Sequence, residues 1–356
     1  MQNRNFCFNC GRILEKKIID LPSFTHFNFE LFDKENIFYL CEKCNFISKK
    51  KIDKKKLNFF NSKKYSFVDH NQKSFNKRKY YLKHEVQFEF IKKNKLFFEG
   101  IKVLDIGCNN GDLINLIRKN IKNSFCKGYD KNPYIKKKLI NKNLFFDYRK
   151  NSVKKFDLII MSHSIIYFED LNKIMYQLSK NLSKNGIIFL ENSDFSRSAY
   201  YLLMGDQYFF FTPFFLQKFF LKYKYFSKIF YPSNLKGNFV MLFSKKKFFV
   251  NNKFKKYDFK KSINYLNTVK NYLMKIKVPK IYILGTTVKA AFLNYFIENK
   301  VKSFVDENLN KKNFLNKRVI HPQKLKKEYF ILVPLKDKKN ILKKLNKSYK
   351  GRFKIL

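Results

Sequence analysis

Hydrophobic residues in this chain form short continuous runs, and between the runs they recur at the three- and four-residue spacing of helices. Runs such as 158–161 and 187–190 are typical of strands that are buried on both faces of a parallel sheet. The alternation predicts an α/β fold whose core is a doubly wound, Rossmann-like sheet. We expect its strands at residues 103–106, 125–130, 144–147, 156–163 and 186–192, and a closing hairpin at 228–231 and 238–244.

A second alternation of strands and helices follows in the C-terminal part. Apolar runs at 280–284, 304–308 and 329–334 predict strands, and the first leads through Gly285 into a helix. A dinucleotide fingerprint needs further glycines in this turn, so we expect this module to pack against or cover a substrate rather than bind a dinucleotide. Upstream of the core, the apolar spacing across residues 71–98 predicts a helix.

The turn after the first core strand is a candidate ligand site. It reads Asp105-Ile106-Gly107-Cys108-Asn109-Asn110-Gly111, with an acidic residue ahead of two glycines. Because glycine has no Cβ, it lets the backbone turn sharply and approach a ligand closely. The third glycine of a dinucleotide fingerprint is missing, so the turn indicates a different nucleotide-like ligand.

Polar side chains stand where the next strands end, and in a parallel sheet these ends share one edge. Asp130 follows Gly111 by 19 residues, near the spacing at which an acidic residue meets ribose hydroxyls. Asp147 ends the third strand, where it is placed to reach an adenine amino group, and Ser162 and His163 end the fourth. For His163 the sequence leaves two readings open, a residue lining the site or one packed locally.

Two cysteine pairs near the N-terminus predict a metal site. Cys7 and Cys10 form one Cys-x-x-Cys pair, and Cys41 and Cys44 form another after 30 intervening residues. Four thiolates from two such pairs suit tetrahedral Zn²⁺, and a closed Cys₄ shell leaves no position for a reacting water. We therefore expect a structural zinc ion that stabilises a segment too short to bury a large core.

The net charge of +49 does not by itself indicate a nucleic-acid partner. The 76 basic residues comprise 68 lysines and eight arginines, and lysine, asparagine and phenylalanine are used heavily along the whole chain. Proteins that recognise nucleic acids favour arginine over lysine and cluster their positive charges. The sequence also begins without the apolar stretch of a secretory signal, and no apolar run is long enough to span a membrane. We expect a cytoplasmic protein without a membrane or nucleic-acid partner.

The glycine turn and the acids that end the next strands resemble motif I and its neighbours in class I S-adenosylmethionine-dependent methyltransferases. The resemblance implies that residues 107–111 pass beneath the methionine part of the cofactor, that Asp130 holds the ribose and that Asp147 faces the adenine. Ser162 and His163 would line the side that carries the methyl group. The implied cofactor-binding set is Asp105, Gly107, Cys108, Asn109, Asn110, Gly111, Asp130, Asp147, Ser162 and His163.

The order of modules is similar to that of the sugar C-methyltransferases, which act on nucleotide-linked 4-keto sugars. It implies a zinc-binding domain at residues 1–62, a methyltransferase domain at 63–248 and a Rossmann-like domain at 249–356. The implied acceptor is a small molecule, first of all a nucleotide-linked sugar or a related metabolite. The oligomeric state and the methylated atom, carbon or oxygen, stay open.

The sequence departs from that family where its catalytic base is expected. The family carries a Tyr-His-Glu-His-x-Ser-Tyr-Phe-Ser-like segment, and alignment with residues 204–212 places Asp206 at the glutamate and Gln207 at the second histidine. Glutamine has no useful basicity. Asp206 could serve a more acidic acceptor, His163 could supply the base, or Gln207 could bind a changed acceptor. Two alternatives therefore stay open, a nucleic-acid methyltransferase and a non-catalytic relative that binds the cofactor.

Overall fold

The computed structural model describes residues 6–26, 28–49, 52, 57–58, 61–63, 74–76, 79–150, 154–235, 237–246, 254, 256–308, 311–334 and 339–356. Internal contacts divide the chain into two units. The first comprises Met1–Lys16, Tyr39–Asp194 and Tyr208–Lys256, and the second Lys17–Phe38, Phe195–Gln207 and Tyr257–Leu356. The three-module division at residues 62 and 248 stays a prediction, because contact density alone does not identify separately folding modules.

The first unit is built on a six-stranded sheet in the order β13-β14-β11-β10-β8-β9. Its strands are β8 (Lys102–Ile106), β9 (Phe125–Tyr129), β10 (Phe156–Ser162), β11 (Leu182–Ser193), β13 (Phe226–Phe230) and β14 (Asn238–Ser244). Strands β8 to β11 pair in parallel, and β14 runs antiparallel between β11 and β13. The predicted Rossmann-like α/β core with its closing hairpin is confirmed.

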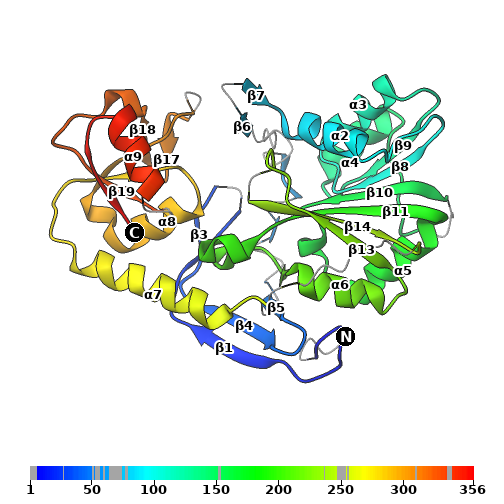
Figure 1. Cartoon of the computed structure of the whole chain (residues 1–356), viewed down its shortest axis with the longest axis horizontal. Coiled ribbons are helices and arrows are strands. Elements are labelled where there is room, and N and C mark those ends of the chain that lie inside the picture. Colours follow the sequence, from blue (N-terminus) through cyan, green and yellow to red (C-terminus); the bar gives the residue numbers. More distant parts are fainter. Residues whose placement is uncertain are drawn as a thin grey trace. The chain divides into compact units, whose positions relative to one another are not determined.

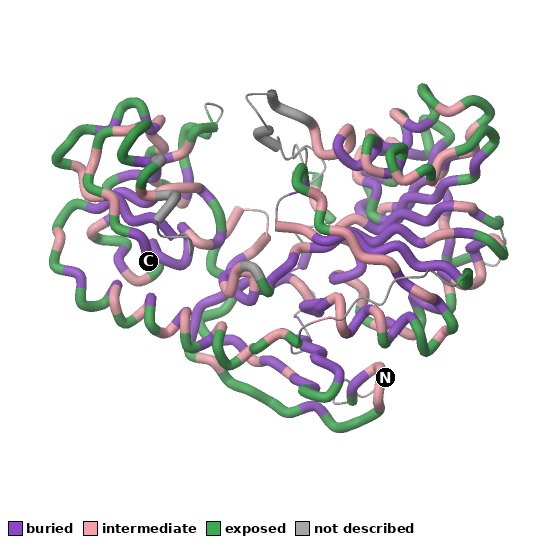
Figure 2. The backbone as a smooth tube through the Cα atoms, in the orientation of Figure 1, coloured by how far each residue is buried: buried purple, intermediate pink, exposed green. Residues whose placement is uncertain are grey.

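Helices cover both faces of this sheet. In Figure 1, α2 (Lys83–Lys93), α3 (Asp112–Asn120) and α4 (Pro133–Asn141) lie on one face, and α5 (Leu171–Asn181) and α6 (Pro213–Leu221) on the other. Fully buried isoleucines of α2 and α3, Ile91, Ile114 and Ile117, pack against the sheet. Strands β8, β10 and β14 are buried along most of their length (Figure 2), which explains their continuous apolar runs.

A four-stranded sheet has the order β1-β4-β5-β12, and β2–β3 and β6–β7 are separate two-stranded hairpins. The strands are β1 (Glu15–Ile19), β4 (Asn36–Cys41), β5 (Phe46–Lys49) and β12 (Phe209–Phe210), with hairpins β2 (Ser23–Phe24)–β3 (Leu31–Asp33) and β6 (Ser74–Asn76)–β7 (Lys79–Tyr81). Short 3₁₀ turns are η2 (Ile165–Tyr167), η3 (Phe195–Arg197) and η4 (Ala199–Leu203). The Phe46 ring contacts Phe209 and Phe215, so β5 is part of the first unit's aromatic core.

The second unit contains another mostly parallel sheet, in the order β17-β18-β16-β15-β19-β20. Its strands are β15 (Ile281–Leu284), β16 (Val301–Val305), β17 (Asn313–Phe314), β18 (Lys317–Ile320), β19 (Phe330–Val333) and β20 (Arg352–Ile355). Helices α7 (Phe259–Lys275), α8 (Val288–Ile297) and α9 (Lys339–Ser348) and turns η5 (Glu298–Lys300) and η6 (Pro322–Lys324) complete it.

Three sequence-based expectations differ from the structure. The strand expected at 304–308 is found at Val301–Val305, so residues 306–308 follow it. The helix expected across 71–98 begins at Lys83, where Glu85 accepts a hydrogen bond from the Leu82 backbone N–H, and strands β6 and β7 precede it. The strand expected at 144–147 is reduced to a bridge between Gly128 and Phe145. Within the described part of the chain, no helix is long and apolar enough to cross a membrane.

Candidate functional site

The glycine turn joins β8 to α3, and its backbone needs both glycines. Gly107 and Gly111 have φ of 84° and 78°, in the left-handed region that L side chains adopt rarely. A Cβ on Gly107 would lie 2.6 Å from the Cβ of Ser164, closer than non-bonded carbons approach. Ser164 fills the space beside Gly107, so the turn packs against the segment after β10 and has no room for a side chain at this position.

Asp105 lies at the end of β8 and is almost completely buried. No described residue donates a hydrogen bond to its carboxylate, although the side chain is only 6% exposed. Burial raises the pKa of Asp105 to about 7; the charge of Asp130 acts in the same direction and that of Lys83 opposes it. A buried carboxylate of this kind is stabilised by a cationic ligand group.

Asp130 follows β9 and anchors the turn. Its Oδ2 accepts the backbone N–H of Asn109 at 3.2 Å, and its Oδ1 accepts that of Asn132 at 2.9 Å. Burial raises the pKa of this carboxyl, and the backbone hydrogen bonds act against the shift. A carboxylate offers about four acceptor positions, so Asp130 keeps capacity for a ligand hydroxyl.

The asparagines of the turn carry buried acceptors. The side-chain Oδ1 atoms of Asn109 and Asn110 have no hydrogen-bond partner among the described residues. Buried polar atoms normally have a partner, so these two oxygens are suited to donors of a bound ligand. Cys108 differs, because its thiol is buried and a Cβ on Gly128 would lie 2.6 Å from its Sγ. Cys108 therefore packs beneath β9.

Asp147 is engaged by an arginine. Arg149 donates from Nε to Oδ1 and from Nη2 to Oδ2, both at 2.8 Å. These hydrogen bonds hold the pKa of Asp147 below its ordinary value. The guanidinium also lies 4.7 Å from the centre of the Tyr129 ring. A ligand at this place would meet an arginine–aspartate pair rather than a lone carboxylate.

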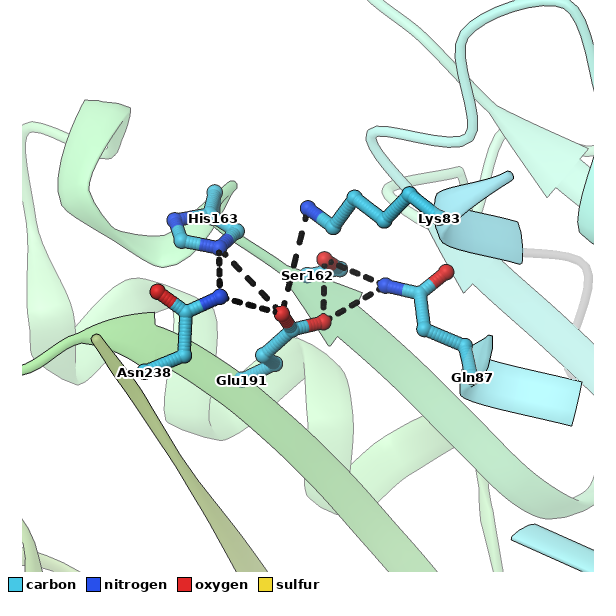
Figure 3. Close-up of polar contacts among 6 residues, drawn as sticks. All are labelled: Lys83, Gln87, Ser162, His163, Glu191 and Asn238. Atoms are coloured by element: carbon cyan, nitrogen blue, oxygen red, sulfur yellow. Dashed lines mark hydrogen bonds and ion pairs between the residues drawn. The ribbon is translucent and has the colours of Figure 1, made fainter. Parts of the chain in front are cut away.

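Ser162 and His163 belong to a polar network around Glu191, which is fully buried on β11 (Figure 3). Oε2 of Glu191 accepts from Ser162 Oγ at 2.9 Å and from Gln87 Nε2 at 2.5 Å. Oε1 accepts from Asn238 Nδ2 at 2.6 Å and lies 3.4 Å from His163 Nε2. The parallel pairing of β10 with β11 sets Ser162 directly beside Glu191.

Glu191 is ionised despite its burial. Burial alone would raise its pKa, but the charge of Lys83 at 4.0 Å and the hydrogen bonds from His163 and Gln87 outweigh it, so the pKa falls well below its ordinary value. His163 has φ of 53°, and its backbone N–H donates to the Glu191 carbonyl at 2.9 Å. The carboxylate, the imidazole and the Lys83 ammonium thus meet at the ends of β10 and β11.

Four members of this network were absent from the sequence-based candidates, namely Lys83, Gln87, Glu191 and Asn238. Two of them carried a signal in the sequence. Glu191 is an acid at the end of an apolar strand, and Gln87 interrupts the apolar face of α2. Buried polar side chains need partners, so both were detectable as network members. Lys83 and Asn238 gave no comparable signal, because lysine and asparagine occur throughout the chain.

Asp206 and Gln207 belong to the second unit. Oδ2 of the buried Asp206 accepts the backbone N–H of His26 at 2.7 Å. Gly205 precedes it, and a Cβ there would lie 2.5 Å from the Phe32 ring. Asp206 therefore anchors the segment 195–207, and a catalytic role for Asp206 and Gln207 stays a prediction.

The four predicted cysteines come together in the first unit. The sulfur atoms of Cys7, Cys10, Cys41 and Cys44 all lie within 4.8 Å of one another. Around a zinc ion with Zn–S bonds of about 2.3 Å, tetrahedral sulfurs are separated by about 3.8 Å. Cys10 and Cys41 are 3.6 Å apart, and Asn9 Nδ2 donates to Cys44 Sγ at 3.3 Å. The arrangement can hold a metal ion.

Comparisons with known proteins bear on the part of the chain that contains the parallel strands β8 to β11 of the first unit. Residues 75–227 match a family described as Methyltransferase domain. A SAM-dependent methyltransferase from Archaeoglobus fulgidus is 16% identical over 45% of this chain and 93% of that chain, with a TM-score of 0.36. A TehB-like SAM-dependent methyltransferase from Corynebacterium glutamicum is 16% identical over 46% and 88%, with a TM-score of 0.34.

A third structure, from Haloferax volcanii, holds a methyltransferase in complex with the Trm112 methyltransferase activator. It is 12% identical over 45% of this chain and 91% of that chain, with a TM-score of 0.38. No curated protein matches the sequence. The segment 75–227 therefore matches a methyltransferase-domain model, and the described strands within it have a Rossmann-like α/β order.

Proposed function

We propose that the chain transfers a methyl group from S-adenosylmethionine to a small acceptor, with nucleotide-linked sugars and related metabolites as the first class to test. The observation that carries the proposal is the row of acids Asp105, Asp130 and Glu191 along the carboxyl edge of a methyltransferase domain. Each acid ends a different strand of the parallel sheet, and ligands bind at that edge in open α/β folds.

The turn residues fit this cofactor. Asp105 and the buried Oδ1 atoms of Asn109 and Asn110 are the acceptors that we assign to its ammonium group. Asp130 accepts from the ribose hydroxyls, as the resemblance implies. When bound, S-adenosylmethionine supplies a methyl group already activated by its sulfonium, so the protein chiefly aligns the acceptor and excludes water.

His163 is our candidate for the general base in this reaction. Its Nε2 faces Glu191, and in Figure 3 the other ring nitrogen, Nδ1, lies on the side away from that carboxylate. Nε2 lies between Glu191 Oε1 and Asn238 Nδ2, 3.4 and 3.1 Å away, and in the tautomer that the proposal requires it carries a proton that faces the carboxylate. Nδ1 then takes a proton from an acceptor hydroxyl or an acidic carbon, and Glu191 stabilises the imidazolium that forms. His163 would thus replace the catalytic histidine of the related family, whose position is occupied here by Gln207. The catalytic role predicted for Asp206 and Gln207 remains a proposal.

The cysteine cluster is proposed to hold zinc in a structural role. Four protein sulfurs would complete the tetrahedral shell, which leaves no open position for a substrate. The ion would connect the segment at residues 7–10 to β4 and the turn before β5. We propose a cytoplasmic setting, because thiols are kept reduced there and remain available to a metal.

A single set of binding and turnover measurements tests the proposal. Calorimetry with S-adenosylmethionine should give an affinity that falls at least tenfold, about 1.4 kcal/mol, in Asp130→Ala. Asp157→Ala is the matched control. At the start of β10, the end of the strand away from Ser162, its partly buried carboxylate accepts a hydrogen bond from the Lys102 backbone N–H. An unchanged affinity in Asp130→Ala would overturn the cofactor assignment.

Turnover separates the competing functions. With labelled S-adenosylmethionine and a panel of nucleotide-linked sugars and small metabolites, His163→Asn should lose transfer at least 100-fold while cofactor binding persists. Label appearing in DNA or RNA would favour a nucleic-acid methyltransferase. Cofactor binding without label in any pool would favour a non-catalytic relative.

A further inference from the structure

The second unit contains a cavity of about 430 Å³, and four of the ten described residues that line it are cationic. Its size lies within the range of small-ligand pockets. The wall includes four basic residues, Lys311, Lys312, Arg318 and Lys324, together with His321 and a single carboxylate, Asp306. Four positive charges against one negative charge give a net charge of +3 with His321 neutral.

The cavity lies where two parallel strands end. Asp306 directly follows β16, His321 directly follows β18, and the Asp306 backbone N–H donates to the Ile320 carbonyl at 3.1 Å. The carboxyl ends of parallel strands are where open α/β sheets bind ligands. The cavity adjoins the turn after β15, because Thr286 of that turn donates a hydrogen bond to Asp306 at the cavity wall.

The lone carboxylate is already bound within the protein. Thr286 donates from Oγ1 to Asp306 Oδ2 at 2.5 Å, and the Asn308 backbone N–H donates to Oδ1 at 2.9 Å. Lys311 Nζ donates to Thr286 Oγ1 at 2.7 Å and to its carbonyl at 3.2 Å. This network holds Lys311 at the cavity wall. Because Asp306 already accepts these hydrogen bonds, its carboxylate neutralises little of the positive charge of Lys312, Arg318 and Lys324.

The remaining cations have fixed backbone positions. Arg318 stands opposite Asn313 in the β17–β18 hairpin, and the Val319 backbone N–H donates to the Lys312 carbonyl at 2.8 Å. Among the described residues, no carboxylate forms an ion pair with Lys312, Arg318 or Lys324. Nδ1 of His321 accepts the Gln323 backbone N–H at 3.3 Å, so its Nε2 is the donor in the neutral ring.

We infer that this cavity binds the phosphate or diphosphate group of a small ligand. Concave, like-charged surfaces concentrate counter-ions, and guanidinium, ammonium and imidazole N–H groups are the donors that phosphate oxygens accept from. The high lysine content of the chain does not by itself explain this cluster of cations. Surface lysines are spread over the whole chain, whereas these residues surround one cavity whose carboxylate is bound by its own neighbours.

Calorimetry on the full chain at fixed ionic strength tests the inference with pyrophosphate, a nucleoside diphosphate and the bare nucleoside. The double variant Arg318→Gln, Lys324→Gln should weaken pyrophosphate binding at least tenfold, about 1.4 kcal/mol. The control Lys277→Gln, Lys302→Gln removes the same charge from exposed positions of this unit outside the cavity, and its affinity should stay within twofold of wild type.

If both anions bind and the nucleoside diphosphate binds more tightly than pyrophosphate, the ligand is a nucleotide. If their affinities are equal, the cavity recognises the phosphate group alone. If the double variant fails to fold, the imidazole NMR signal of His321, assigned with His321→Gln, should still shift on pyrophosphate addition to wild type. Equal weakening in both double variants, or no saturable binding of either anion, overturns the inference. The outcome is separate from the proposed methyl transfer, because S-adenosylmethionine binding is measured independently on the same variants.

Discussion

Replacement of Glu191 by glutamine removes the charge at the centre of the network in Figure 3. The carboxylate accepts from Ser162 and Gln87 on one oxygen and from Asn238 and His163 on the other. A glutamine amide has one acceptor oxygen, so its NH₂ group would face the donors of the other side. The variant therefore loses hydrogen bonds to a charged group and leaves buried donors unsatisfied.

The expected loss follows from these contacts. Two hydrogen bonds to a charged group contribute about 1.5–3 kcal/mol each, and local rearrangement recovers part of that, so we expect the free energy of unfolding to fall by about 3 kcal/mol. The variant also loses the charge attraction to Lys83, which lies 4.0 Å away and is only 20% exposed, so the loss should not be smaller than this. Glu89→Gln, on the exposed side of α2, makes the same chemical change and should stay within about 0.5 kcal/mol.

Urea unfolding followed by far-UV circular dichroism measures this difference, since the chain has no tryptophan. With a slope near 3 kcal/mol per molar urea, the midpoint of the affected transition should move down by about 1 M. A midpoint for Glu191→Gln equal to that of Glu89→Gln would refute the reasoning from the network.

The pH dependence gives a second readout for the same residue. The folded-state pKa of Glu191 lies below its unfolded value, so its stabilising contribution is present above about pH 4.3 and is lost as the pH falls through the folded pKa. The stability difference between wild type and Glu191→Gln should therefore shrink in acid. A difference independent of pH would contradict an ionised Glu191.

Three further changes test the other sites. Cys41→Ser, Cys44→Ser should release about one zinc per chain in metal analysis, whereas Cys126→Ser should retain it; equal zinc in both would contradict the site. Gly107→Ala should cost about 2 kcal/mol or more in unfolding experiments, because its φ and the nearby Ser164 Cβ exclude a side chain; an unchanged midpoint would count against that geometry. Affinity for S-adenosylmethionine should rise with pH through about 7 as Asp105 ionises, and calorimetry on Asp105→Asn should show no such rise; the same slope in both would remove Asp105 from the site.

Local signals accounted for much of the fold. Continuous apolar runs marked β8, β10 and β11, and the pattern at 228–231 and 238–244 indicated the antiparallel pair β13–β14. The helix expected across 71–98 was too long, because helical spacing cannot reveal that residues 74–76 and 79–81 pair with each other. Strand pairing depends on a partner segment, and a single stretch of sequence does not contain that information.

The sequence by itself determined the strand–turn–helix unit at Asp105–Gly111, the acid Asp130 after the next strand and the two cysteine pairs. Each depends on neighbouring residues and on backbone rules, so spacing alone revealed them. The tertiary structure decided which side chains act together. Glu191 gains its charge state from Lys83, Gln87 and His163, which come from other segments, and the cavity near Asp306 forms only when β16, β18 and their loops meet. Burial and electrostatics depend on these long-range contacts, and sequence spacing does not encode them.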